Sequence, residues 1–216
     1  MICTVIAYKS FEECRDILSR ETCAELRLDL LDLNEEQMRE LFSMPSRTVA
    51  TCRSCHLSDK KRRILLETAI TSGATYVDLE LEMPAELRQN LIEFAKTHRC
   101  TIIISYHNYD STPSLPELNR IIKRCRKVGA DIVKVACKVN QQRDLTNLFA
   151  LYAGGDRIIA FGMGEQGLIT RLAAPLLGAE FTYASADDDS ATASGQMKSD
   201  DMRLFYKQYG FKLDAF

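Results

Sequence analysis

One lysine of this chain occupies an unusual place for a charged side chain. Lys134 lies in the middle of residues 132–136, Ile-Val-Lys-Val-Ala, an apolar and β-branched run that predicts a buried strand. Burial disfavours the ammonium form, lowers the pKa of a lysine and leaves a free amine that can attack a carbonyl carbon. The sequence therefore predicts an imine-forming lysine, provided that the other elements build a carbonyl site around it.

Predicted strands and predicted helices alternate along the chain with little sequence left over. Strands are predicted at 3–7, 24–29, 48–52, 76–80, 101–105, 132–136, 158–161 and 180–184. Helices are predicted at 11–18, 35–42, 60–71, 85–97, 115–127, 141–152, from about residue 166, and at 199–209. Pro84 and Pro116 fall in predicted first turns, and Gly73 and Gly129 follow predicted helix ends.

This alternation predicts the fold class. Eight βα repeats in 216 residues are typical of an α/β protein of the (β/α)8 or TIM-barrel type. A doubly wound open sheet is the alternative, but its first turn is usually glycine-rich, and here that turn is Tyr8-Lys9-Ser10. Because no low-complexity linker or break in composition divides the chain, we expect residues 1–216 to form a single barrel domain.

The composition excludes some classes of protein. A net charge of −2 provides no basic excess for binding nucleic acid. No apolar run approaches the roughly 18 residues that span a bilayer, and the N-terminus lacks the features of a secretory signal. We therefore expect a protein that binds neither nucleic acid nor membranes.

The eight cysteines suggest where the protein acts. Most lie in apolar, strand-like or helical segments, as reduced thiols do in cytoplasmic proteins. Cys52 and Cys55 have CxxC spacing and are followed by His56, so a zinc or redox site is an alternative. No second CxxC or matching histidine pair accompanies them, and we expect no metal.

In a (β/α)8 barrel, residues at the carboxyl ends of the strands meet at one mouth. Glu25, Arg27 and Asp29 lie two residues apart, so they share one face of their strand. Asp78 and Glu80 share a face of another strand for the same reason. One such pattern fits a half-exposed antiparallel strand, but several of them accompanying a buried lysine favour a polar cavity.

His107 is the histidine best placed for chemistry, since it follows an apolar strand at the mouth end. His98 falls at a predicted helix end and His56 in a predicted loop. An imidazole titrates near neutral pH and can carry protons. Arg53 and Arg171 also follow predicted strands, and arginine binds carboxylates through paired hydrogen bonds. We expect a small anionic carbonyl substrate that bears hydroxyl groups.

Several segments resemble, in the same order, the type I 3-dehydroquinate dehydratases. They are Glu-Leu-Arg-Leu-Asp at 25–29, Tyr-Val-Asp-Leu-Glu-Leu at 76–81, Ser-Tyr-His-Asn-Tyr at 105–109, Asp-Ile-Val-Lys-Val-Ala at 131–136, and 162–172. The resemblance implies a homodimeric barrel that converts 3-dehydroquinate to 3-dehydroshikimate, without metal or cofactor, in the shikimate pathway of aromatic amino acid biosynthesis. In some organisms this enzyme is fused to shikimate dehydrogenase, and such a fusion remains open here.

The resemblance also implies roles for individual residues. Lys134 would form the imine with the C3 ketone, and His107 would remove the C2 proton and later protonate the leaving hydroxyl group in a syn elimination. Glu80 would orient His107 by a hydrogen bond. The implied substrate-binding residues are Glu25, Arg27, Arg53, Arg171, Thr192 and Gln196, with Arg171 and Gln196 at the carboxylate end.

One loop departs from the family pattern. Residues 192–196 are Thr-Ala-Ser-Gly-Gln, where the family usually has Ser-Ala-Pro-Gly-Gln. Thr192 keeps the hydroxyl group, whereas loss of the proline predicts a more mobile loop. The acidic run 187–189 is interpreted as a solvated loop tip without an assigned role.

Two other functions fit the same residues. A class I aldolase would use the same lysine chemistry, but it would usually have a phosphate site after strands seven and eight. Those loops contain Arg171 and Gln196 rather than a clear glycine-rich turn. A non-catalytic binding barrel, in which Lys134 is an ion-paired structural residue, is the second alternative.

Overall fold

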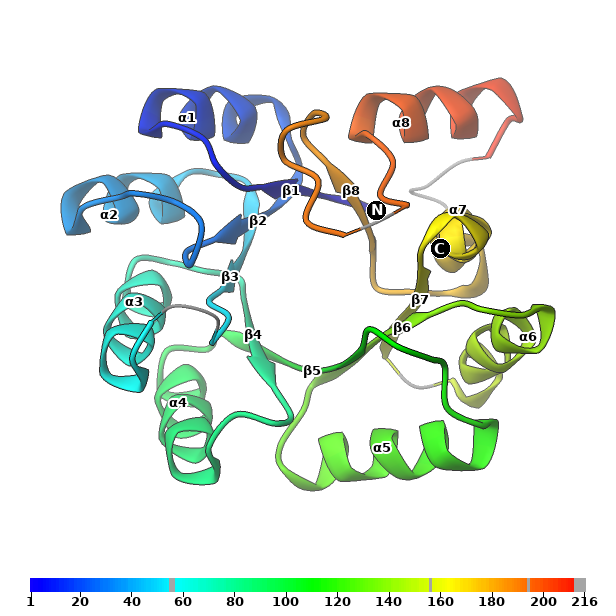
Figure 1. The fold of residues 1–216 in the computed structure, drawn as a ribbon. Helices are drawn as coiled ribbons and strands as arrows, with labels where there is room; N and C mark the ends of the chain where they lie inside the picture. The colour runs from blue at the N-terminus through cyan, green and yellow to red at the C-terminus, as the bar shows by residue number, and fades with distance from the viewer. Residues whose placement is uncertain (55–56, 156, 194, 212–216) are drawn as a thin grey trace.

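The protein is a barrel of eight parallel strands (Figure 1). This computed structural model describes residues 1–54, 57–155, 157–193 and 195–211. The strands are β1 (Ile2–Ile6), β2 (Cys23–Arg27), β3 (Arg47–Thr51), β4 (Tyr76–Glu80), β5 (Thr101–Asn108), β6 (Ile132–Lys138), β7 (Ile158–Met163) and β8 (Thr182–Ser185). They pair in the order β7-β6-β5-β4-β3-β2-β1-β8. Within the described residues, no strand pair joins β7 to β8, so the barrel is nearly closed.

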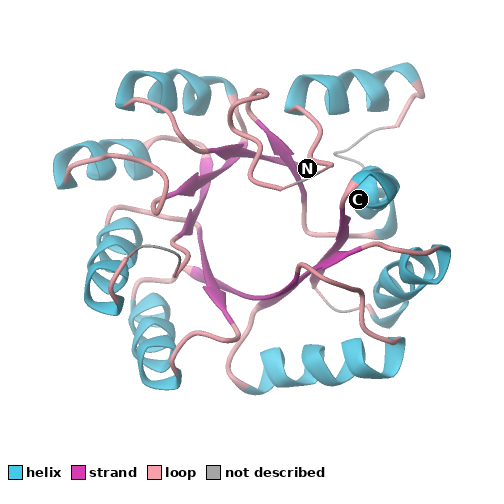
Figure 2. Cartoon of the chain, in the orientation of Figure 1, coloured by secondary structure: helices cyan, strands magenta, loops and turns pink. Residues whose placement is uncertain are grey.

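The helices form a ring around the strands (Figure 2). They are α1 (Phe11–Arg20), α2 (Glu35–Ser43), α3 (Asp59–Thr71), α4 (Ala85–Thr97), α5 (Leu115–Lys127), α6 (Gln142–Ala150), α7 (Leu168–Ala173) and α8 (Ser199–Gln208). Short 3-10 helices η1 (Leu151–Gly154), η2 (Glu165–Gly167) and η3 (Ala174–Leu177) accompany α6 and α7. Among the described residues, no helix is long and apolar enough to cross a membrane.

The predicted (β/α)8 architecture is confirmed, and the differences lie at element ends. β5 runs to Asn108 and β7 to Met163, beyond the predicted ends. The extension of β5 makes His107 a strand residue, in register with Ala136 of β6. The predicted helix 141–152 ends at Ala150 and tightens into η1, and Pro84 lies just before α4 rather than inside it.

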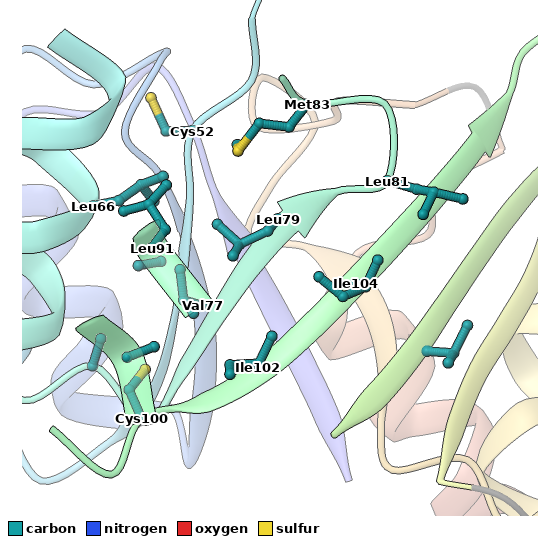
Figure 3. Packing of buried hydrophobic residues seen from close by; sticks show 14 of the residues in the cluster. Cys52, Leu66, Val77, Leu79, Leu81, Met83, Leu91, Cys100, Ile102 and Ile104 are labelled. Carbon is teal, nitrogen blue, oxygen red and sulfur yellow. The ribbon is translucent and has the colours of Figure 1, made fainter. Parts of the chain in front are cut away.

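Two apolar layers hold the barrel together. Figure 3 shows the outer layer, in which Val77 and Leu79 of β4 lie beside Leu66 of α3 and Leu91 of α4. A second cluster, which includes Val5, Ile103, Ile159 and Phe181, fills the interior. Because side chains alternate along a strand, the residues next to Val77 and Leu79 point inward. The outer packing therefore fixes which side chains enter the barrel.

Candidate active site

A cavity opens where the strands end. It is lined by all the predicted site residues except Glu80, and by several apolar and aromatic side chains. The predicted residues are Glu25, Arg27, Arg53, His107, Lys134, Arg171, Thr192 and Gln196, and the others are Val5, Tyr109, Ala136, Phe161, Met163, Tyr183 and Ala193. The structure therefore brings together residues from all parts of the sequence.

Lys134 lies on β6 and is buried, with 4% of its surface exposed. Its Nζ donates a hydrogen bond to Asp78 Oδ2 at 2.8 Å and a longer one to Glu25 Oε1 at 3.4 Å. Nζ also lies 3.9 Å from the centroid of the Tyr183 ring. Both carboxylates and the aromatic face are partners for an ammonium group. The sequence indicated that Lys134 is buried but did not indicate these partners. Because the partners suit an ammonium group, Nζ must give up a proton before it can attack a carbonyl carbon.

Asp78 connects the charged groups of the cavity, although sequence reasoning gave it no role. It accepts hydrogen bonds from Ser105 Oγ at 2.6 Å, from Lys134, and from Arg53 Nη2 at 3.1 Å. Burial alone would raise the pKa of Asp78, but Arg53 and Lys134 outweigh burial and hold this pKa below its ordinary value. Its position two residues before Glu80 was the sequence signal, since both face the interior.

We expect Asp78→Asn to destabilise the fold by about 3 kcal/mol at pH 7, because Lys134 and Arg53 lose their buried counter-charge. A carboxylate with a lowered pKa stabilises the fold above its unfolded pKa, about 3.9, and this contribution is lost as pH falls through the folded value. The gap between the two proteins should therefore shrink below about pH 4. Urea unfolding of both proteins at pH 7 and below about pH 4 measures this gap in stability.

The matched control is Asp16→Asn, which breaks an exposed pair with Arg20 (2.9 Å). Both side chains of that pair are mostly in water, so the loss should stay within about 0.5 kcal/mol. Equal losses from the two substitutions would contradict the role given to Asp78.

His107 is placed as a neutral base. Its Nε2 lies 3.5 Å from Arg53 Nη2. Burial, together with the charges of Arg53 and Lys134, holds the pKa of His107 well below its ordinary value. The Tyr109 ring stacks on the imidazole, with centroids 6.1 Å apart and an interplanar angle of 13°. An imidazole that is uncharged at pH 7 can accept a proton from substrate.

Glu80 does not meet the expectation of a direct contact with His107. Its Oε2 accepts a hydrogen bond from Arg62 Nη2 at 2.9 Å, and its Oε1 lies 3.7 Å from Arg53 Nη1. Within the described residues, no hydrogen bond joins Glu80 to His107. Arg62 of α3 is fully buried and also donates to the Cys52 carbonyl. This second arginine orients Glu80, and Arg53 lies between Glu80 and the histidine.

Arg27 is held by a carboxylate outside the cavity lining. Its Nη2 and Nε donate to the two oxygens of Asp29 at 2.7 and 3.1 Å, a bidentate pair. The sequence predicted both on one face of a strand that ran to Asp29, but β2 ends at Arg27, and it is the turn after β2 that brings the two side chains into contact. Asp29 therefore fixes the guanidinium that reaches the cavity.

Arg171 is a buried cation with little compensation from the protein. Its Nη1 makes one long hydrogen bond, 3.5 Å, to the Tyr183 carbonyl, and Nε has no partner among the described residues. Its Cζ lies 4.2 Å from the centroid of the Phe161 ring. Burial lowers the pKa of Arg171 to about 10, so it stays charged at pH 7. A buried cation with unused donors beside a cavity is suited to bind an anion.

The packing of α7 on β7 explains why Arg171 points inward. A Cβ on Gly162 would lie 2.9 Å from the Cα of Gly167, so only glycine permits this approach. The Gly162 N–H donates to Thr170 Oγ1 at 2.6 Å, which fixes the helix against the strand. Arg171, the next residue, is then directed into the cavity.

Thr192 and Gln196 lie on the loop between β8 and α8. The Thr192 N–H donates to Gln196 Oε1 at 3.0 Å. Gly195 has φ +75°, and a Cβ there would lie 2.4 Å from the Gly164 carbonyl oxygen. Ser194, where the family usually has proline, lies outside the described residues, and increased mobility of the loop stays a prediction.

The acidic run 187–189 is not only a solvated tip. Asp187 forms an ion pair with Lys9 at 2.7 Å, whereas Asp188 is largely exposed. The interpretation from sequence therefore fits Asp188 and misses the partner of Asp187, since that partner comes from the other end of the chain.

The predicted alternatives for the cysteines are tested only in part. Cys52 is buried, while Cys55 and His56 lie outside the described residues. Among the residues that are described, no group of three or more His, Cys, Asp or Glu side chains could hold a metal ion.

Comparison with known proteins agrees with this geometry. Residues 2–212 match the family described as Type I 3-dehydroquinase. The chain belongs to this family. A 3-dehydroquinate dehydratase of Desulfotalea psychrophila is 35% identical over 195 residues, covering 86% of each chain. A 3-dehydroquinate dehydratase of Dehalococcoides mccartyi is 34% identical over 223 residues, covering 98% of this chain and 96% of its own.

A solved structure of the same family has the same fold. The crystal structure of the 3-dehydroquinate dehydratase of Aquifex aeolicus aligns with a TM-score of 0.80 and 27% identity. The alignment covers 97% of this chain and 98% of that one. Membership of the type I 3-dehydroquinase family thus extends over the whole barrel.

Proposed function

We propose that this type I family member dehydrates 3-dehydroquinate to 3-dehydroshikimate through an imine on Lys134. It is then a hydro-lyase of the shikimate pathway, which leads to the aromatic amino acids. The observation that supports the proposal is the cavity itself. It combines one buried lysine, a histidine with a lowered pKa, and a buried arginine with unused donors.

Imine formation comes first. Lys134 Nζ attacks the C3 carbonyl carbon, and the carbonyl oxygen leaves as water, which gives a protonated C=N bond. Neutral His107 is the base in the cavity that can accept the proton that Nζ must lose. Asp78 and Glu25, which pair with the ammonium, then face the cationic imine.

Elimination follows on the imine. His107 removes the C2 proton, the C–H electron pair forms a C2=C3 double bond, and the π pair of the C=N⁺ bond moves onto nitrogen to give an enamine. The enamine expels the C1 hydroxyl group, which leaves as water with the proton that His107 returns. Hydrolysis of the conjugated imine frees Lys134 and the enone. Because one base serves both proton transfers, the elimination is syn.

Different residues of the cavity bind different parts of the substrate. Arg171 supplies a buried cation for the C1 carboxylate, and Gln196 and Thr192 lie on the same rim. Glu25, Arg27 and Arg53 are the partners for the ring hydroxyl groups. Glu80 acts as a positioning residue, because it contacts Arg53 and Arg62 rather than the cavity.

The two alternative functions make different demands on the site. The aldolase alternative has no specific observation in its favour, whereas Arg171 offers a site for a carboxylate. A non-catalytic barrel would require that Lys134 serve only its ion pairs with Asp78 and Glu25. Activity with 3-dehydroquinate and trapping of the imine separate these functions.

The direct test is to mix the purified protein with 3-dehydroquinate and to follow the ultraviolet absorbance of the conjugated enone. A rise in absorbance is expected, and the proton lost from C2 should lie on the same face as the leaving hydroxyl group. No rise from well-folded protein would overturn the proposal and return the aldolase to consideration.

We further propose that the enzyme acts in the cytoplasm as a homodimer. Each cysteine that the structure describes is buried, as reduced thiols that serve as small apolar side chains are, and this suits a reducing compartment. The family resemblance supports the dimer. Sedimentation of the purified chain at several concentrations tests the oligomeric state.

A further inference from the structure

The loop between β8 and α8 is tied at its start to the loop between β1 and α1. Lys9 follows β1, and its side chain is only 9% exposed. Its Nζ lies 2.7 Å from Asp187 Oδ2. The Ser190 N–H donates to the other oxygen, Asp187 Oδ1, at 2.9 Å. One carboxylate therefore joins a lysine from one end of the chain to the backbone of a loop near the other end.

Backbone contacts strengthen the same junction. The Ser190 side chain is fully buried, and its Oγ donates to the Ala7 carbonyl at 3.3 Å. The Ala186 N–H donates to the Val5 carbonyl at 3.1 Å. Figure 1 shows the loop after β8, in orange, beside β1. The start of the loop is thus docked on the first βα unit.

Thr192 and Gln196 follow this junction on the same loop. Their mutual hydrogen bond places the Gln196 amide at the rim of the cavity. Between them in the chain, Gly195 packs directly on the Gly164 backbone after β7. The described part of the loop therefore reaches across the mouth from β1 to β7, and it carries Thr192, a predicted substrate-binding residue, and Gln196, predicted at the carboxylate end.

We propose that Lys9 and Asp187 are positioning residues, which hold the β8–α8 loop so that Thr192 and Gln196 reach the carboxylate end of the substrate. The substrate assignment rests on the proposed function, whereas the support of the loop does not. Neither residue lines the cavity, so both act through the loop rather than by contact with substrate.

Burial explains why this pair matters more than other ion pairs of the loop. Lys198 and Asp188 also pair within the loop, at 3.4 Å, but their side chains are 41% and 85% exposed. Exposed pairs contribute little, because water screens them and their side chains lose entropy. Lys9 is largely withdrawn from water, and removal of its charge leaves the Asp187 carboxylate without the cation that ties it to the first βα unit.

The test compares Lys9→Met with Lys198→Met. We expect Lys9→Met to raise the KM for 3-dehydroquinate by about tenfold and to change kcat by less than about threefold, because binding is weakened without loss of the nucleophile. Amide hydrogen exchange in residues 186–193 should accelerate. Lys9→Arg, which keeps a cation, should restore both the KM and the exchange rate of the loop. Lys198→Met should alter neither the KM nor the exchange rate.

A double-mutant cycle separates positioning from a general structural effect. If Lys9 acts through the loop, Lys9→Met should add little to the KM of Gln196→Ala, because the ligand that it positions is already absent. A merely structural role predicts additive effects. Asp187→Asn, at a half-exposed position, gives the same measurements if Lys9→Met folds poorly.

The outcomes distinguish this proposal from the proposed function. Unchanged exchange of the loop in both Lys9→Met and Asp187→Asn overturns the positioning role, whatever the enzyme does. Faster exchange with an unchanged KM also overturns it, because the loop then does not hold the substrate. If the native chain is inactive with 3-dehydroquinate, the function fails, and exchange alone still decides whether the pair holds the loop.

Discussion

Lys134→Ala is expected to lower kcat for dehydration of 3-dehydroquinate by at least about 10⁴-fold, because loss of the nucleophile removes the covalent route. Without the imine, the C2 proton is acidified only by a neutral ketone, which is a weaker electron sink than a protonated imine. The enone absorbance measures turnover. Borohydride with substrate or product should add mass to the native chain and none to the variant.

Two further variants test whether Lys134 acts as the nucleophile or only as a positive charge. Lys134→Arg keeps a cation for Asp78 and Glu25 but cannot form an imine. If Lys134 were only an ion-pair partner, the arginine variant would keep activity, and this result would contradict the mechanism. Lys138 lies on the same strand outside the cavity, so Lys138→Ala should retain both turnover and borohydride trapping.

Much of the fold was predictable because each local pattern agrees with the global arrangement. The capping boxes at Ser10 and Glu13 of α1 and at Asn34 and Gln37 of α2 define helix starts that the sequence also indicates. Parallel strands alternating with helices admit few topologies, and the glycine-free first turn then favoured the barrel over a doubly wound sheet.

The residues of the cavity were predictable for a related reason. A residue two positions from a known inward-facing residue must also face inward, which places Glu25 with Arg27 and Asp78 with Glu80. That rule assigns a side chain to the cavity. It does not determine which partner the side chain takes there, because partners lie on other strands at distances that the stagger of the barrel sets.

The contacts that the sequence did not predict all concern which partner a side chain takes. Arg62 belongs to a charged helix start and looks solvent-exposed in the sequence, yet it is buried against Glu80 and the Cys52 carbonyl. Lys9 and Asp187 are far apart along the chain and meet only because β1 pairs with β8. Tertiary proximity therefore decides which charges are paired.

The proton-transfer role of His107 leads to the second large effect. His107→Ala should lower kcat by about 10³-fold, within the range for loss of a general acid–base group. Lys134 remains, so borohydride should still label His107→Ala in the presence of substrate, but more slowly than the native chain, because His107 also accepts the proton that Nζ loses. Labelling as fast as in the native chain would contradict the role of His107 in imine formation, and undiminished turnover would contradict its role in elimination.

The pH dependence of kcat/KM tests the physical cause of the lowered pKa as well as the identity of His107 as the base. A base must be unprotonated, so kcat/KM should fall as pH drops below the pKa of His107 in the free enzyme. An ordinary histidine would give this fall near pH 6.5, about the value in model peptides. Because burial, Arg53 and Lys134 lower the pKa of His107, we expect the fall at a distinctly lower pH.

Arg53 provides the variant that moves this profile in a known direction. Arg53→Gln removes a positive charge 3.5 Å from His107 Nε2, so protonation of the imidazole becomes easier and its pKa should rise. The acid side of the kcat/KM profile should move to higher pH, in addition to any loss of binding. Arg39→Gln, which breaks an exposed pair with Glu35, is the control and should leave the profile in place. An unmoved profile in Arg53→Gln would mean that His107 is not the group that titrates.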